Sequence, residues 1–126
     1  MPVMNNRKNF VIDLDQCICD VAINGKTATS VSAILSAKEV KGAREWVNRL
    51  SSQGHFICFF SNRQETFRTA TTEWLKDHGF KYDSLIMGKP YADNYHYIDD
   101  RHVQATTFRG RYAPLVRKEH PIQVFE

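Results

Sequence analysis

The stretch Asn9-Phe-Val-Ile-Asp-Leu-Asp15 decides the fold, because an unbroken block of strand-forming residues ends there in two acids. The apolar block at 10–12 lacks the alternation of a half-exposed strand, which predicts a central strand buried on both faces. Similar apolar runs at 55–60 and 84–87 predict two further strands, and the run at 95–98 predicts a fourth. The chain is therefore expected to form a sheet.

Two amphipathic helices are expected between these strands. Ala43, Trp46, Val47 and Leu50 recur at three- and four-residue spacing, and Gly54 follows them as a helix-ending residue. A second apolar face runs through 67–75 and ends at His78-Gly79. Alternating strands and helices are typical of an open, mostly parallel sheet covered by helices, so the predicted class is α/β.

The length of 126 residues suits one domain, 1–126. Within it, residues 16–36 predict a small polar flap whose Asn24-Gly25 pair is a strong hairpin signal. Residues 108–126 form a C-terminal tail that begins basic and ends in a possible edge strand at 122–125. No internal repeat or linker divides the sequence.

Composition narrows the class of protein. Hydrophobic residues make up 42% and charged residues 25%, which excludes a disordered chain and a membrane span. The net charge of +3 is too small for a dedicated nucleic-acid binder but suits an anionic substrate. Three cysteines do not make a disulfide framework, and the polar N-terminus lacks the apolar stretch of a signal peptide, so a cytoplasmic location is expected.

Each predicted strand ends in a side chain suited to chemistry. Because ligands of open α/β sheets bind beyond the carboxyl ends of the strands, these side chains are expected to share one crevice. Converging carboxylates would repel one another, and Mg²⁺ is the cation that suits such an all-oxygen site. The remaining ammonium and hydroxyl suit a phosphate group. The residues concerned are Asp13, Asp15, Ser61, Lys89, Asp99 and Asp100.

Taken in order, these residues resemble motifs I to IV of the haloacid dehalogenase superfamily over about residues 9 to 105. The sequences at 88–93 and 97–101 are similar to those of small capless phosphatase-like proteins of bacterial capsule and lipopolysaccharide biosynthesis. The resemblance implies a three-layer Rossmann-like fold with helices on both faces, a flap after the first strand and no cap domain. One departure is Cys17, where the superfamily usually has Thr or Val.

The resemblance also implies a role for each residue. Asp13 would be the nucleophile and a Mg²⁺ ligand. Asp15 would be the general acid and base, with its backbone carbonyl on the metal. Ser61 would hold the phosphoryl group and Lys89 would neutralise it, while Asp99 or Asp100 would complete the metal site. Asn62 and Arg63 are candidate substrate-binding residues, although Arg63 could equally pair with a helix carboxylate.

These roles imply a Mg²⁺-dependent phosphatase that hydrolyses a phosphate monoester through an aspartyl-phosphate. The gaps between the motifs are too short for a folded cap, so the substrate is either large or covered by a neighbouring subunit of a homo-oligomer. A sugar phosphate of polysaccharide assembly is the substrate class that the resemblance favours.

Two other functions are compatible with parts of the pattern. A catalytically silent protein of the same fold could bind a phosphorylated partner, although both Asp13 and Asp15 are retained. A phospho-receiver signalling domain is of similar length, but its phospho-accepting aspartate should end a middle strand. No acid stands at 60–62, which argues against a receiver.

Overall fold

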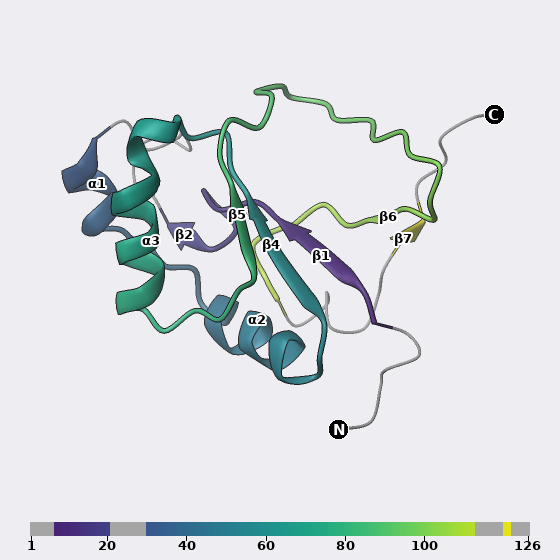
Figure 1. Ribbon diagram of the computed structural model, residues 1–126, viewed down its shortest axis with the longest axis horizontal. Helices are drawn as coiled ribbons and strands as arrows, with labels where there is room; N and C mark the ends of the chain where they lie inside the picture. Colours follow the sequence, from purple (N-terminus) through teal and green to yellow (C-terminus); the bar gives the residue numbers. More distant parts are fainter. Residues whose placement is uncertain (1–6, 21–29, 113–119, 122–126) are drawn as a thin grey trace.

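A parallel three-stranded sheet forms the centre of the computed structural model, which describes residues 7–20, 30–112 and 120–121 (Figure 1). The strand order is β1 (Asn9–Ile12), β4 (Phe56–Phe60), β5 (Ser84–Ile86). In the β1–β4 pair Phe10 lies opposite Ile57, and in the β4–β5 pair Phe59 lies opposite Leu85. The first three predicted strands and the α/β class are thus confirmed.

The two predicted helices are also confirmed. They are α2 (Ala43–Ser52) and α3 (Arg68–Asp77), the second preceded by the 3₁₀ turn η1 (Glu65–Phe67). Gly54 and Gly79 follow them at φ angles of 93° and 74°, a left-handed conformation that glycine adopts without strain. Each helix therefore ends where the sequence predicts.

The hydrophobic core lies on one face of the sheet. Because parallel partners point to the same side, Ile57, Phe59 and Leu85 share that face, and all three belong to the core that Val47 and Trp74 supply from α2 and α3. On the opposite face, Val11 is 59% exposed and Ile86 is 47% exposed. Within the described residues, the expected second helical layer is therefore not seen.

The prediction of a fourth strand at 95–98 is wrong, and so is that of a central β1. No residue from 91 to 103 is in a strand, residues 91–100 are all exposed, and β1 forms an edge of the described sheet. A parallel crossover normally needs about a dozen residues or more, whereas only 87–94 separate β5 from the expected strand. The connection is too short to return the chain beside β1.

The described part of the flap joins the main core. Strand β2 (Cys19–Asp20) pairs antiparallel with β3 (Lys38–Glu39), and between them lies the short helix α1 (Val31–Leu35), capped by the Ser30 hydroxyl. Ile18 and Ile34 are fully buried. The flap is therefore anchored by apolar packing at both ends, while the Asn24-Gly25 hairpin lies outside the described residues.

Two aromatic side chains at the start of the C-terminal tail, Phe108 and Tyr112, pack against the core, while residues 109–111 between them are exposed. Tyr112 is buried, and its ring lies 5.0 Å from that of Trp46. Strand β6 (Gln104–Ala105) pairs antiparallel with β7 (His120–Pro121), and the expected edge strand at 122–125 lies outside the described residues. In the portion of the chain described, no helix has the length and apolarity needed to cross a bilayer.

Candidate functional site

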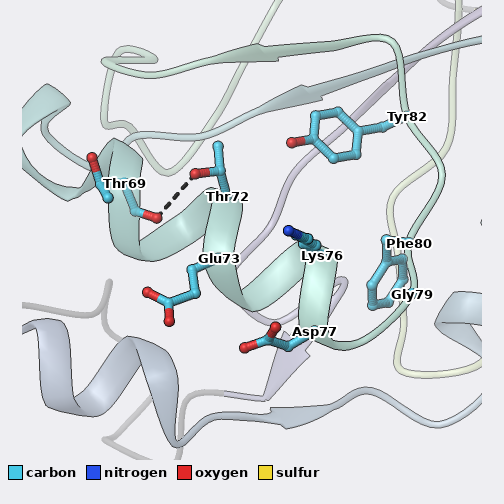
Figure 2. Close-up of a pocket in the computed structure, with 8 residues that line it drawn as sticks. All are labelled: Thr69, Thr72, Glu73, Lys76, Asp77, Gly79, Phe80 and Tyr82. Atoms are coloured by element: carbon cyan, nitrogen blue, oxygen red, sulfur yellow. Dashed lines mark hydrogen bonds between the residues drawn. The ribbon is translucent and has the colours of Figure 1, made fainter.

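A surface cavity of about 800 Å³ runs along the outer side of α3 (Figure 2). It is lined by Thr69, Thr72, Glu73, Lys76, Asp77, Gly79, Phe80 and Tyr82. None of these residues was predicted to be functional, and the cavity is open and shallow. The charged side chains of its lining are all exposed to solvent, and none is a buried group directed into the cavity. The strand ends are therefore the stronger candidate for a catalytic site.

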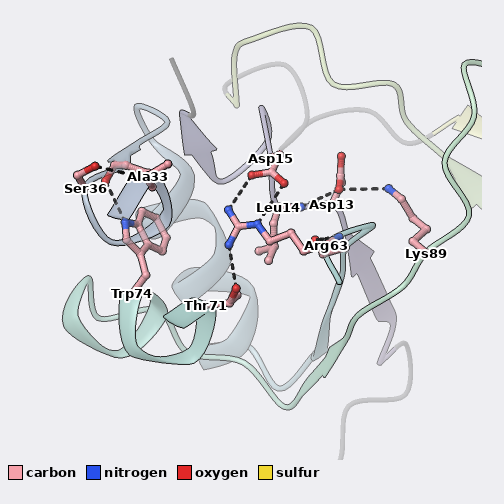
Figure 3. Close-up of polar contacts among 11 residues, drawn as sticks. Asp13, Leu14, Asp15, Ala33, Ser36, Arg63, Thr71, Trp74 and Lys89 are labelled. Atoms are coloured by element: carbon pink, nitrogen blue, oxygen red, sulfur yellow. Dashed lines mark hydrogen bonds and ion pairs between the residues drawn. The ribbon is translucent and has the colours of Figure 1, made fainter. Parts of the chain in front are cut away.

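The carboxyl ends of the three parallel strands bring together three of the predicted residues. Asp13 directly follows β1, Ser61 directly follows β4, and Lys89 lies shortly after β5. The Lys89 N–H donates to the Ser61 carbonyl at 2.8 Å, and this hydrogen bond joins the loop after β5 to the loop after β4. The Lys89 Nζ then lies 3.2 Å from Asp13 Oδ1 (Figure 3).

This Asp13–Lys89 pair is half open to solvent. The Asp13 side chain is 37% exposed and that of Lys89 is 11% exposed. Both the ammonium and the Leu14 N–H, at 2.9 Å, contact Oδ1 of Asp13. Burial raises the pKa of Asp13 above its ordinary value, although Lys89 and the Leu14 N–H act in the opposite direction.

We expect Asp13 to titrate above the ordinary aspartate pKa of about 3.9, and higher still after Lys89→Met. The lysine favours the ionised form, so its removal leaves the desolvation of the carboxylate unopposed. Carboxyl ¹³C NMR titration measures the midpoint, with Lys76→Met, an exposed lysine on α3, as the matched control. A lower midpoint in Lys89→Met would contradict the electrostatic assignment.

The second acid of the pair, Asp15, is held by Arg63 in the interior. Arg63 Nη2 lies 2.7 Å from Asp15 Oδ1, and Arg63 Nε lies 3.1 Å from Oδ2, while Nη1 donates to Thr71 Oγ1 of α3 at 2.9 Å (Figure 3). The Arg63 and Asp15 side chains are only 1% and 8% exposed. Burial disfavours the guanidinium charge, but Asp15 outweighs it and raises the pKa of Arg63.

The Arg63–Asp15 pair changes what both residues can do. Of the two roles left open for Arg63, this arrangement supports ion pairing, with Asp15 rather than a helix carboxylate as its partner. The guanidinium is buried, and each of its three nitrogens donates a hydrogen bond within the protein, so direct contact with substrate is not what the structure provides. Asp15 is only 8% exposed, and each of its carboxylate oxygens accepts a hydrogen bond from Arg63, so little of the carboxylate is open to a substrate.

Ser61 is also an interior residue. It is fully buried, and its Oγ accepts a hydrogen bond from the Arg63 N–H at 3.0 Å. The Arg63 carbonyl in turn accepts from the Gly88 N–H at 2.9 Å. The turn after β4 is therefore locked against the loop after β5, with Asn62 half-buried between its neighbours.

Asp99 and Asp100 are not brought to this site. Both are exposed, and Asp100 Oδ1 lies 3.9 Å from Arg101 Nε. The Arg101 N–H donates to Asp99 Oδ1 at 3.0 Å and lowers the pKa of Asp99. Within the described ranges no three His, Cys, Asp or Glu side chains form a group that could hold a metal. The expected four carboxylates do not converge, because the strand that was to deliver two of them is not formed.

The described side chains at the strand ends do not form a four-carboxylate site, so a Mg²⁺ bound there would take most of its ligands from water and substrate. Mg²⁺ is commonly held by one or two carboxylates and completes its shell with water and substrate phosphate. Asp13 is partly exposed and both of its contacts are to Oδ1. Asp15 has both carboxylate oxygens on Arg63. Asp13 is thus the residue that would hold the ion.

Sequence reasoning missed three side chains that shape the site. Lys89 Nζ lies 5.9 Å from the Phe60 ring centroid and 5.3 Å from that of Tyr95. Thr71, the partner of Arg63, had a usable signal, because it is a hydroxyl residue on the apolar face of a predicted helix. Tyr95 had none, since its approach to Lys89 depends on how the chain turns at Pro90.

The turn after Asp15 is closed by its own backbone and by the tail. The Leu14 carbonyl accepts hydrogen bonds from the N–H groups of Cys17, Ile18 and Cys19. The Tyr112 hydroxyl donates to the Cys17 carbonyl. Burial raises the pKa of the Cys17 thiol to about 12, so this residue is protonated at neutral pH and serves as a small packing group.

Comparison with known proteins bears on the fold. No family model matches the sequence, and no curated protein matches it. Among solved structures, the chain is similar to the crystal structure of an MCSG target from Vibrio cholerae, with 24% identity and a TM-score of 0.52. The match covers 76% of this chain and 82% of that one. At this identity the likeness supports the α/β fold alone.

Proposed function

We propose that this protein is a Mg²⁺-dependent phosphohydrolase that cleaves a phosphate monoester through a phosphorylated Asp13. The observation that carries the proposal is the contact of 3.2 Å between Lys89 Nζ and Asp13 Oδ1 at the carboxyl edge of a parallel sheet. A carboxylate with a solvent-facing side and an ammonium beside it suits attack on a dianionic phosphate. The order of the motif residues is the basis for proposing membership of the haloacid dehalogenase superfamily.

The reaction would proceed in two displacements at phosphorus. A carboxylate oxygen of Asp13 forms a bond to phosphorus as the ester P–O bond breaks, and the leaving oxygen takes the electron pair and a proton. Water then attacks the acyl phosphate, which releases inorganic phosphate and restores the Asp13 carboxylate. Lys89 offsets the phosphate charge in both steps. A bound Mg²⁺, held by Asp13, would supply further charge neutralisation.

Proton transfer is the step for which the structure sets a condition. The resemblance assigns it to Asp15, which accepts two hydrogen bonds from Arg63. Each carboxylate oxygen keeps a second lone pair, so the condition is that the leaving oxygen or water reaches the small exposed part of Asp15. The resemblance further suggests a sugar phosphate from capsule or lipopolysaccharide assembly as the substrate, and an open site would admit a large one.

The Arg63–Asp15 pair favours one alternative, a catalytically silent protein that binds a phosphorylated partner. The buried bidentate ion pair, with a third hydrogen bond from Arg63 to Thr71, leaves Asp15 only 8% exposed, which limits its access to a leaving oxygen or to water. Asp13 and Lys89 would then recognise phosphate without turning it over. The two functions share one binding site and differ in whether a P–O bond is broken.

Hydrolysis of an aryl phosphate with Mg²⁺, compared with hydrolysis in excess EDTA, tests the proposal. We expect chelation to lower kcat/KM by about a hundred-fold or more, since a metal stabilises phosphoryl transfer by several kcal/mol. In parallel, inorganic phosphate should protect Lys89 from acetylation, as read by mass spectrometry. Protection without hydrolysis would support the silent binder, and the absence of both would sink the assignment of a phosphate site.

A further inference from the structure

We propose that Tyr95, together with Phe60, positions the ammonium of Lys89, so that these two rings act as an aromatic clamp at the site. The clamp deepens the function proposed above, since the use of Lys89 for phosphate rests on it. The placement of the ammonium between Asp13 and the rings does not depend on that function. Tyr95 is therefore a positioning residue, and it acts through Lys89.

The first support is the surroundings of the ammonium. Lys89 Nζ lies 5.3 Å from the Tyr95 ring centroid and 5.9 Å from that of Phe60, both within the range of cation–π attraction. Asp13 is its one carboxylate contact at 3.2 Å in the described part of the chain. The lysine side chain is 11% exposed although it follows the strand in an open loop. The ammonium is thus flanked by the two rings and the carboxylate.

The second support is that Tyr95 is itself held in place. Its hydroxyl donates to the Pro90 carbonyl and accepts from the Ala92 N–H at 3.0 Å. Its ring stacks on that of Tyr97, with centroids 6.1 Å apart and planes 19° from parallel. Residues 91–103 contain no regular secondary structure, so these side-chain contacts, rather than a helix or strand, hold Tyr95 beside Lys89.

A held lysine suits recognition of phosphate. The lysine side chain is a point charge on a flexible four-carbon stem, and ordering that stem during binding costs free energy. The clamp orders the stem before a phosphate arrives. The rings carry no net charge, so they do not neutralise the ammonium as a second carboxylate would, and the ammonium keeps its capacity to bind a phosphate oxygen.

Acetylation of Lys89 in the full-length protein, measured residue by residue by mass spectrometry, tests the clamp without any substrate. The informative comparison is Tyr95→Phe with Tyr95→Leu, because both lose the hydroxyl and only Phe keeps a π face. We expect Lys89 in Tyr95→Leu to react about five- to thirty-fold faster than in Tyr95→Phe. Lys89 should likewise be acetylated faster in Phe60→Leu than in Phe60→Tyr.

Equal rates in the Phe and Leu variants, or a slower rate in Leu, would overturn the proposal, since only the Phe variant keeps the ring face on which the clamp depends. Tyr91→Leu is the matched control, because Tyr91 is 76% exposed on the same loop. Lys89 in Tyr91→Leu should be acetylated at the wild-type rate. If the clamp is supported but the wild type hydrolyses no phosphate ester, the proposed function fails alone. If the wild type is active and the rates are equal, the clamp fails alone.

Discussion

Asp13→Asn is expected to lower kcat/KM for an aryl phosphate by at least about a thousand-fold, because an amide does not form the acyl phosphate that carries the reaction. The substitution is nearly isosteric. Its Oδ1 can still accept the hydrogen bond from the Leu14 N–H, which is 2.9 Å from Oδ1 in the wild type. The fold should survive, so lost activity will report chemistry. Initial rates with Mg²⁺ and urea denaturation of both proteins provide the two measurements.

Asp77→Asn is the control for this experiment. Asp77 is an exposed aspartate at the end of α3 and lines the shallow surface cavity, so its substitution should leave the rate unchanged. Acid quenching during turnover should also trap phosphate on the peptide that contains Asp13 in the wild type and on no peptide in Asp13→Asn. Comparable rates for Asp13→Asn and the wild type would remove the nucleophile assignment.

Arg63→Met is expected to lower the free energy of unfolding by about 3–5 kcal/mol, because it leaves the buried Asp15 carboxylate without its cation. The wild-type guanidinium makes two hydrogen bonds to Asp15 and one to Thr71, and its side chain is 1% exposed. For a domain whose whole stability is about 5–15 kcal/mol, that loss is a large share. Urea denaturation followed by circular dichroism measures it.

Arg44→Met provides the matched control. Arg44 also pairs with a carboxylate, Glu39, at 3.0 Å, but its side chain is 49% exposed. Its loss should cost less than about 1 kcal/mol, since water solvates both charges of an exposed pair. Adding Asp15→Asn to Arg63→Met should recover part of the lost stability, because no buried charge is then left unpaired. Similar losses for the two arginine variants would contradict the buried pair.

Much of the fold was predictable because it depends on local patterns. Apolar runs marked β1, β4 and β5, and three- and four-residue spacing marked α2 and α3. Parallel pairing then placed the residues after β1, β4 and β5 at one sheet edge. That is why the sequence alone predicts the meeting of Asp13 with Lys89, which lies 76 residues later in the chain.

The expectations that failed concerned features that a local pattern does not encode. The run at 95–98 has the residues of a strand, but the connection at 87–94 is too short for a parallel crossover to the outer edge of β1 in the described sheet. Asp99 and Asp100 consequently stay in solvent. Helices were expected on both faces of the sheet, but the helices described all contribute to the core on the same face.

Order along the chain was therefore enough to place a carboxylate and an ammonium at the same edge of a sheet. Whether each polar group faces solvent, a substrate or another side chain depended on three-dimensional packing. Arg63 shows the reason most clearly, because a guanidinium takes a buried carboxylate as its partner only where the backbone brings one within hydrogen-bonding distance. Such a distance is set by how β1, β4 and α3 pack together, and no spacing in the sequence expresses it.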